Sequence, residues 1–466
     1  MDPLARSVLQ RLPLAEAVLW LWRWIADDDY LQTLFEAHRG RCYEKVIRFP
    51  LLVNLIADAL LEHGGSANQS FEHAIEHDQL QASVQAAYGK LRRLPVALSM
   101  AFLAGCTDRL RALFPAAAQA PAPASLRRLR RIVYDGKALK RVAKRLKPLR
   151  GIPGGLLGGR ALVALDLDTG LAAALHAHPD GDANDVRFVP TLLPEVRRRW
   201  AGPRLHVADR QFCGLPQLAA FTAEEGDHFL VRYHASVAFY PDADRPPRGG
   251  LDGAGRAYTE EWGWLGSPAN KHRRYVRRIT LPRPGAEAVV LVTDLLDADS
   301  YPGSDLLAVY LDRWGIERVF QKVTEVFGLQ GLIGGTPQAT IFQFAFCLVL
   351  YNLIQVVRGY VAEAQQRPAQ TISVEKLFAD VTEELIAWNR VVEPATTVAL
   401  FAAPLARAAL QARLRVLLAG VWTERWLKAP GKKPAPPAKK GKRTHGSVYR
   451  ILEAHKRQQR SQKRQQ

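Results

Sequence analysis

Residues 301–328 constrain the fold most strongly, because they predict a single amphipathic helix with clear ends. Pro302 interrupts the preceding structure, Ser304 is a suitable N-cap, and Gly328 stands where the helix should stop. Between these ends, apolar side chains recur with helical spacing at Ile316, Phe320, Val323 and Phe327. The stretch therefore predicts a helix over about 304–327 with one buried face.

Three polar side chains gather on another face of this predicted helix. At about 100° per residue, Tyr310, Arg313 and Glu317 fall within roughly 60° of one another, about 90° round from the apolar stripe. A phenol, a guanidinium and a carboxylate beside a buried face can meet a metal ion and a phosphate together. The alternative interpretation is an ordinary surface helix with an Arg–Glu pair at i,i+4.

The order Tyr310-x-x-Arg313-x-x-x-Glu317 resembles the Y-R-E-K signature of bacterial insertion-sequence transposases of the DDE class. The resemblance implies that Glu317 is the third catalytic carboxylate and that Tyr310 and Arg313 hold a DNA phosphate. The Lys of the signature lies seven residues after the Glu, where this chain has Thr324. Lys322 points roughly 140° away from Glu317 on a helix and is a poor substitute.

Two aspartates precede this helix at predicted strand ends. Asp135 and Gly136 follow a short apolar strand over 131–134, in a segment rich in Lys and Arg. They resemble the first catalytic aspartate of the family, which is followed by Gly and then Thr or Ser, whereas Lys137 stands here. Asp209 follows a strand over 204–208, and Asp209-Arg210-x-Phe212 resembles the second aspartate motif of the family, D-R-x-F.

Other acids and histidines compete for a role in a metal site. Asp166 and Asp168 lie beside a predicted hairpin turn, which explains Asp168 by turn chemistry. His176 and His178 alternate on the returning strand, and no third ligand accompanies them in the sequence. We therefore expect structural roles for these four residues.

The charge of the chain favours an anionic partner. The net charge is +19, and 12 of the 64 Lys and Arg residues lie in 429–466. Cys42, Cys106, Cys213 and Cys347 show no paired spacing, which predicts free thiols in a reducing compartment. The most apolar run, 341–354, is too short to span a bilayer and predicts a buried helix, so we expect no membrane partner.

The order of predicted elements indicates a multidomain α+β protein. A strand, a hairpin, a helix, a strand, a helix and a strand precede the Glu317 helix, which is the order of a ribonuclease H-like fold. The predicted division is a helical DNA-binding domain (1–115), a linker (116–125), the first part of the catalytic core (126–235), a β-rich insertion (236–303), the second part of the core (304–358), a helical C-terminal region (359–428) and a basic disordered tail (429–466).

Several basic and aromatic residues are candidates for DNA contact. The first group is Lys90, Arg92 and Arg93 at a predicted helix junction, where a solvated surface is the alternative. The second group lies in the insertion, where basic residues alternate with aromatic ones, as suits backbone contact and base stacking: Trp262, Trp264, Arg273 and Arg274. Arg210 is a further candidate beside Asp209.

The resemblance implies a transposase that cuts the ends of its own element and joins the 3′-OH ends to target DNA. Asp135, Asp209 and Glu317 would then hold two Mg²⁺ ions, with Mn²⁺ as a substitute. The expected partner is double-stranded DNA carrying terminal inverted repeats, bound by a homodimer in the cytoplasm of a bacterium, near the nucleoid. The alternatives are a metal-dependent DNA nuclease on the same fold and a catalytically inactive or domesticated DNA-binding protein.

Overall fold

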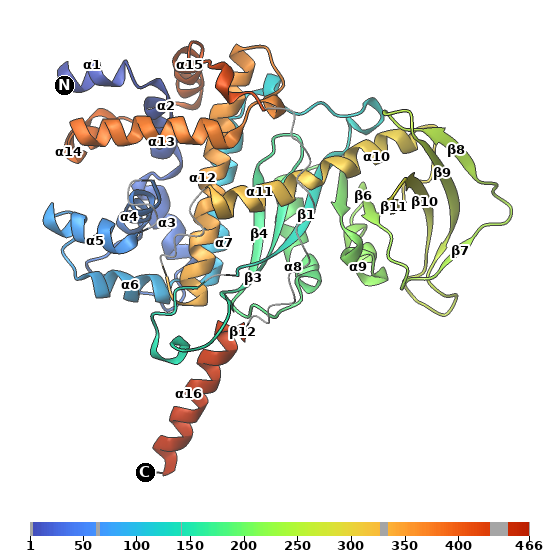
Figure 1. Cartoon of the computed structure of the whole chain (residues 1–466), viewed down its shortest axis with the longest axis horizontal. Coiled ribbons are helices and arrows are strands. Elements are labelled where there is room, and N and C mark those ends of the chain that lie inside the picture. Colours follow the sequence, from blue (N-terminus) through green and yellow to red (C-terminus); the bar gives the residue numbers. More distant parts are fainter. Residues whose placement is uncertain (1–2, 62–65, 141, 327–333, 429–445, 466) are drawn as a thin grey trace.

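The computed structural model describes residues 3–61, 66–140, 142–326, 334–428 and 446–465. The protein combines α-helices with one large mixed sheet, as expected for an α+β chain (Figure 1). Phe327 and Gly328, expected at the end of the Glu317 helix, lie outside the described residues.

The N-terminal part is helical, as predicted. Its helices are α1 (Pro3–Leu9), α2 (Pro13–Ile25), α3 (Asp28–His38), α4 (Phe49–Leu61), α5 (Ala67–Glu76), α6 (Val84–Arg93) and α7 (Val96–Leu113). Ser83 caps α6 by accepting a hydrogen bond from the backbone N–H of Ala86, and Pro95 is the N-cap residue of α7. The residues after α7 form short 3₁₀ turns at 116–118 and 124–126 that lead into the sheet.

The sheet has ten strands in the order β4-β3-β1-β5-β6-β11-β10-β9-β7, with β8 paired to β9. β1 pairs antiparallel with β3 and parallel with β5, and β5 pairs parallel with β6. The strands are β1 (Arg130–Ala138), β3 (Arg160–Asp166), β4 (Ala172–His178), β5 (Arg204–Ala208), β6 (Asp227–Arg232), β7 (Phe239–Pro241), β8 (Arg248–Leu251), β9 (Ala257–Leu265), β10 (Arg274–Arg283) and β11 (Ala286–Thr293).

The residues expected to form a separate β-rich insertion continue this sheet. β11 pairs antiparallel with β6 through three residue pairs, from Leu291↔Arg232 to Thr293↔Leu230. β10, β9 and the short strands β7 and β8 then follow in antiparallel order at the far end of the molecule (Figure 1). The insertion is therefore bonded to the central strands through its last strand, β11.

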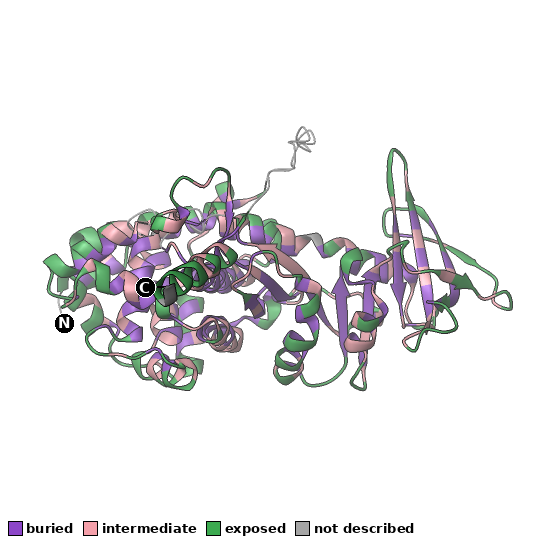
Figure 2. Cartoon of the chain, turned by 90° about the horizontal axis from the view of Figure 1, so that it is seen from below, coloured by how far each residue is buried: buried purple, intermediate pink, exposed green. Residues whose placement is uncertain are grey.

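Alternate residues of the central strands face two different hydrophobic cores, as the two-residue period of a strand requires. Val133 and Val163 belong to a core that includes α12 (Pro337–Ala364), α7 and the N-terminal helices. Ile132 and Ala164 belong to a second core with α8 (Val189–Arg199) and α9 (Leu215–Phe221). The sheet is thus covered on both faces, and its central strands are buried (Figure 2).

α12 organises the first core. It is the one helix among the described residues that is long and apolar enough to cross a membrane, yet that apolar stretch lies wholly inside the protein. It packs against α7, α2, α13 (Val374–Val391) and α15 (Arg407–Leu418). The hydrophobic core is therefore continuous from the N-terminal helices to the C-terminal ones and does not divide near residue 115.

The C-terminal residues differ from the expected disordered tail. Residues 429–445 lie outside the described residues, but β12 (Gly446–Ser447) pairs with β2 (Leu156–Leu157), and α16 (Val448–Gln465) follows as a helix. The remaining helix of the C-terminal part is the short α14 (Pro394–Leu400).

Asn352 is a buried polar residue that joins α12 to the edge of the sheet. Its side chain accepts a hydrogen bond from the N–H of Ala172 and donates to the carbonyl of Ala172 and to Thr107 Oγ1, each at 2.8 Å. It therefore satisfies the N–H of Ala172 in β4, the edge strand, and shares the carbonyl of Ala172 with Thr107 Oγ1, which donates to it at 3.1 Å.

We expect Asn352→Leu to lower the free energy of unfolding by about 2–4 kcal/mol, because it leaves the N–H of Ala172 without its acceptor and removes one of the two donors to the Ala172 carbonyl, the other being Thr107 Oγ1 at 3.1 Å. Thr107→Val is the matched control and should cost about 1 kcal/mol, since Asn352 keeps both bonds to Ala172. Urea denaturation of the three proteins measures the difference. Equal losses of unfolding free energy for the two variants would show that the bonds from Asn352 to Ala172 do not contribute most of its stabilising effect.

Candidate functional site

Asp135 and Asp209 lie at neighbouring positions on two parallel strands. The last residue pair between β1 and β5 is Tyr134↔Ala208, so Asp135 and Asp209 each come one position later. The prediction that β1 ends at residue 134 holds only on the β5 side, because the pairing of β1 with β3 continues to Ala138. The divergence of β1 from β5 after Tyr134 opens the space in which the two carboxylates meet.

Gly136 is required for close packing beside the site. A Cβ at this position would lie 1.7 Å from Oδ2 of Asp185, a buried acid that also forms an ion pair with Arg160. The N–H of Gly136 donates to Oδ1 of Asp135 at 2.9 Å, which fixes that carboxylate. The side chain of Asp209 is held in a similar way, by the N–H of Gln211 at 2.9 Å.

Glu317 reaches the same place from a helix. The predicted single helix is two helices, α10 (Gly303–Asp312) and α11 (Trp314–Glu325), which meet at Arg313. The hydrogen bonds there change to i→i−3, from Arg313 to Tyr310 and from Ile316 to Arg313, which tightens the chain locally. α11 packs against β1, and Glu317 lies in its first turn.

The electrostatics of Asp135 indicate that the three acids face one another. The pKa of Asp135 is raised to about 7, mainly by burial and also by the nearby carboxylates of Asp209 and Glu317, against the lowering effect of Arg313. Arg313 donates to Oε1 of Glu317 at 3.2 Å and is only 3% exposed. The carboxylates of Asp135, Glu317 and Asp209 all raise the pKa of Arg313, so one guanidinium serves the whole cluster.

This cluster fits a divalent cation in its chemistry, although the side chains do not stand in a coordinating arrangement. Among the described residues, no group of three or more His, Cys, Asp or Glu side chains is close enough to hold a metal ion as it stands. The three carboxylates, two of which raise the pKa of the buried third, nevertheless form the oxygen donor set that Mg²⁺ and Mn²⁺ prefer. Bound positive charge would relieve their mutual repulsion.

Tyr310 and Arg313 do not present the phosphate-binding surface expected from the sequence. Tyr310 is 2% exposed, and its ring lies 5.4 Å below the guanidinium of Arg313. Both side chains are buried because α10 and α11 press this face against the sheet. Arg313 therefore neutralises the acids, and Tyr310 supports Arg313 from beneath.

Lys137 is a site residue whose importance the sequence did not reveal. It lies two positions after Asp135 on β1, on the same face of the strand, and its Nζ is 5.5 Å from the centre of the Phe320 ring on α11. Thr324, one turn further along α11, directs its hydroxyl to the carbonyl of Phe320. Lys322 points away from the site, as expected, and pairs with Glu375 of α13 at 3.1 Å.

The competing acids and histidines have structural roles, as expected. Asp166 is buried, pairs with Arg130 and accepts a hydrogen bond from Thr169 in the hairpin turn, and Asp168 pairs with Arg131. The histidines pack on aromatic rings instead of converging on a metal site: His176 on Phe188, and His178 on Phe188 and Tyr449.

The basic residues predicted at the helix junction separate into buried and exposed ones. Lys90 is 3% exposed and donates to the carbonyl of Tyr43 at 2.8 Å, so its predicted contact with DNA is wrong for this conformation. Arg92 and Arg93, at the end of α6, are exposed. Arg92 and Arg145 line a cavity of about 500 Å³ between α6 and the start of α12, and their contact with DNA stays a prediction.

The candidate DNA-contact residues of the insertion also differ in burial. Trp262 is buried and donates to the carbonyl of Leu296 at 2.9 Å, and the half-buried Arg274 donates to the carbonyl of Leu218 at 2.8 Å. Both side chains have structural partners, and their contact with DNA stays a prediction. Trp264 is 39% exposed, with the guanidinium of Arg273 4.3 Å from its ring centre. These two remain candidates for base stacking.

Arg210, the remaining candidate beside Asp209, is exposed and pairs with Glu287 of β11 at 3.2 Å. This ion pair connects the turn after β5 to the last strand of the insertion. Its predicted contact with DNA remains a prediction.

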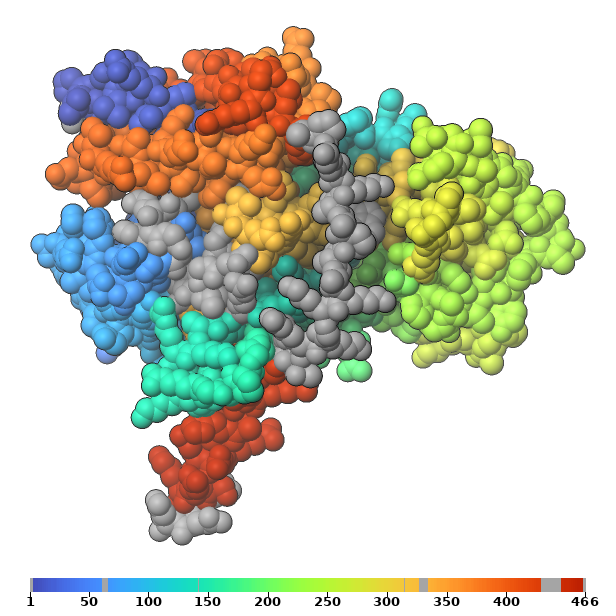
Figure 3. All heavy atoms as spheres, in the orientation of Figure 1, coloured from blue at the N-terminus to red at the C-terminus, as the bar shows by residue number. Residues whose placement is uncertain are grey.

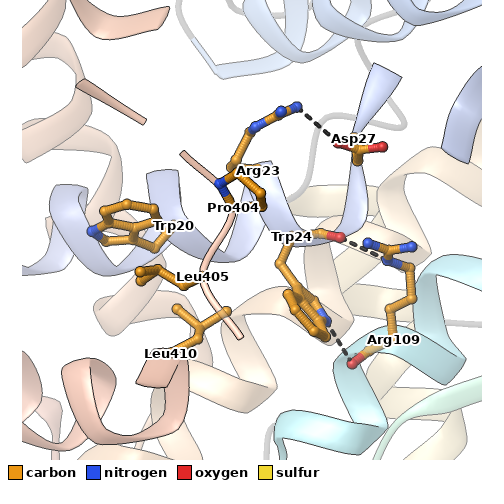
Figure 4. A pocket seen from close by; sticks show the side chains of 8 residues that line it. All are labelled: Trp20, Arg23, Trp24, Asp27, Arg109, Pro404, Leu405 and Leu410. Atoms are coloured by element: carbon orange, nitrogen blue, oxygen red, sulfur yellow. Dashed lines mark hydrogen bonds and ion pairs between the residues drawn. The ribbon is translucent and has the colours of Figure 1, made fainter. Parts of the chain in front are cut away.

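A small cavity elsewhere in the molecule has no acidic cluster and no connection to this site. It measures about 60 Å³ and lies between α2, α7 and the residues before α15 (Figure 4). Arg109 donates to the carbonyl of Trp24 at 2.7 Å, and Arg23 pairs with Asp27 at 3.1 Å. We interpret it as a packing gap between helices.

The raised pKa of Asp135 predicts a pH dependence of stability in the absence of divalent metal. An unfolded Asp ionises near pH 3.8 and the folded one near 7, so the folded state loses stability as the pH rises between these values. In EDTA, we expect the stability of the wild type relative to Asp135→Asn to fall by roughly 2–4 kcal/mol from pH 4 to pH 8. Urea denaturation at both pH values measures this, and a difference independent of pH would refute the assignment.

The comparisons with known proteins show a family similarity for part of the chain. The family described as "Transposase DDE domain" matches residues 153–353, less than half of the chain, a range that includes Asp209 and Glu317 and begins after Asp135. The search of curated proteins gave no match. Among solved structures, the chain is similar to a cryo-EM structure of a piggyBac transposase synaptic complex with hairpin DNA, at 13% identity and a TM-score of 0.42, covering 90% of this chain and 87% of that chain. Residues 153–353 of this chain therefore match the model of the DDE transposase domain family.

Proposed function

We propose that this protein is a DNA transposase that cleaves the ends of its own insertion sequence and joins the 3′-OH ends to target DNA. The observation that carries the proposal is the meeting of Asp135 and Asp209, at neighbouring positions on β1 and β5, with Glu317 on α11. This arrangement corresponds to the three motifs of a ribonuclease H-like core, and the DDE transposase domain match covers two of the three acids.

Asp135, Asp209 and Glu317 would hold two Mg²⁺ ions, which supply an activated oxygen nucleophile and offset charge on the transferring phosphate. Asp135 must lose its proton before it can act as a ligand, and its raised pKa makes this loss favourable only at about neutral pH and above. Arg313 would keep Glu317 in place until the acids bind metal, because Arg313 and Glu317 are joined by a charge-assisted hydrogen bond.

Lys137 would supply the phosphate-facing charge that the signature places seven residues after the Glu. It projects from β1 toward α11 next to Phe320, one turn before Thr324, so a cation reaches the same side of the acids from the strand instead of the helix. Arg92, Arg93, Trp264 and Arg273 are the exposed or partly exposed candidates for holding duplex DNA beyond the site. We further propose a homodimer, since two element ends must be cut together, and a location in the bacterial cytoplasm.

A metal-dependent nuclease on this fold is the second candidate, and the same cluster of acids favours it. It would cut DNA without joining the new 3′ ends. An inactive DNA-binding protein is disfavoured because the three carboxylates occur together in the fold.

Cleavage of labelled DNA carrying the inverted repeats that flank the coding region tests the proposal. With Mg²⁺, we expect nicking at the element boundary followed by joining to a target duplex, and Glu317→Gln should lower both by at least about 100-fold. Glu325→Gln is the matched control on the same helix, because Glu325 is exposed and accepts from Gln321, and it should leave the rates unchanged.

The two rival functions give different results in the same assay. Cleavage without joining would favour the nuclease, and tight binding with no cleavage in Mg²⁺ or Mn²⁺ would favour the inactive DNA-binding protein. Either outcome overturns the transposase proposal.

The role of Lys137 has its own test, in which a second substitution restores the charge. Lys137→Met keeps the length of the side chain and should reduce cleavage about tenfold or more, because one charge-assisted contact to phosphate is lost. Adding Thr324→Lys to this variant should restore most of the rate. If Thr324→Lys has no effect on the Lys137→Met protein, Lys137 does not replace the signature Lys.

A further inference from the structure

α16 projects from the body of the protein as a single helix held only at its root (Figures 1 and 3). β12 pairs with β2 at Gly446↔Leu156 and Ser447↔Leu157, and Ser447 donates to Asp180 at 2.7 Å. Val448 is buried in a small cluster with Val142, Leu149 and Leu156. The root of α16 is therefore fixed by strand pairing, a polar contact and apolar packing.

Beyond this root the helix carries cations on one exposed face. Every residue from Lys456 to Lys463 is exposed. At about 100° per residue, four cations fall within roughly 120° of one another: Lys456, Arg457, Arg460 and Lys463. Glu453 is the one acid in α16 and pairs with Lys456 at 2.8 Å, so it offsets only one of these charges.

An isolated helix of this kind is electrostatically unfavourable. Like charges at i,i+3 and i,i+4 repel, by about 0.2–0.5 kcal/mol per pair, and the sequence places Lys456, Arg457 and Lys463 at these spacings from Arg460. The exposed part gains no compensating burial in the described structure. A polyanion lying along the cationic face would remove the repulsion.

The opposite face shows which polyanion fits. It carries Gln458, Ser461 and Gln462. A membrane-surface helix or a helix that enters a protein groove needs an apolar face, and the apolar residues Ile451 and Leu452 already pack at the root. Cations with neutral polar neighbours suit the phosphate backbone of a nucleic acid.

The root of α16 lies at the end of the sheet that carries the candidate site. β1 ends three residues after Asp135, and the next residue, Leu139, bonds to Gly158 and Gly159, directly after β2. The helix is about 27 Å long, roughly eight base-pair steps of a duplex. The root of α16 is therefore connected to the end of the strand that carries Asp135.

We propose that α16 is an arm that binds the backbone of duplex DNA through Lys456, Arg457, Arg460 and Lys463 without reading its sequence. The choice of DNA rests on the proposed transposase function, whereas the cationic face and its fixed root do not. Binding by the arm adds affinity that depends strongly on salt and is the same for every DNA sequence.

Fluorescence anisotropy of the full chain with a 30-base-pair duplex of arbitrary sequence, without divalent metal, tests the arm. The arm variant replaces the four cations with Gln. The control variant also replaces four exposed cations with Gln, but these lie among the N-terminal helices, α13 and α15 and not on α16: Arg11, Lys376, Arg390 and Arg407. The slope of log K against log salt should fall by about three for the arm variant and much less for the control. The substituted side chains are exposed, so both variants should keep the far-ultraviolet circular dichroism of the wild type.

Equal changes for both variants would show a general effect of net charge and overturn the proposal. An unchanged slope for the arm variant would overturn it as well. So would an arm variant that binds DNA like the wild type but no longer binds phosphatidylglycerol vesicles. Because the assay needs no cleavage, a failed transposition assay with an intact effect of the arm would reject the proposed enzyme function and leave the arm.

Discussion

The electrostatic repulsion among three carboxylates around Arg313 is the constraint on which the rest of the candidate site depends. Asp135 is buried, and its pKa rises to about 7 because burial and two further acids oppose its ionisation. A fold tolerates such repulsion only where a cation balances it. Within the described chain, Arg313 provides part of that balance from a buried position between the strands and α11.

The surrounding structure can be understood as support for this cluster. β1 and β5 separate after Tyr134 and Ala208, which makes room for the two aspartates, and α10 and α11 meet at Arg313 so that its guanidinium turns inward. Cores on both faces of the sheet hold these elements in place. The acids are thus presented by regular, well-packed elements, as a site of high precision requires.

Much of this arrangement could be predicted from local sequence signals. The apolar strand residues before Asp135 and Asp209 and the helix start at Pro302 depend on neighbouring residues, so the sequence predicts these elements and their order along the chain. Whether Lys90 and Trp262 are buried or exposed depends on tertiary packing. The spacing of basic and aromatic residues in the sequence does not determine which of them face inward. Asp185 was missed because its only signal is its contact with Gly136 in space.

The most direct test of the account is a titration with Mn²⁺ followed by electron paramagnetic resonance at pH 8, on the wild type and on Asp135→Asn, Asp209→Asn and Glu317→Gln. If the three carboxylates form one cation site, each single variant should weaken Mn²⁺ binding by about 10- to 100-fold. Glu325→Gln should bind like the wild type. Mn²⁺ binding that survives in all three variants would contradict the central claim, because the acids would then meet without forming a metal site.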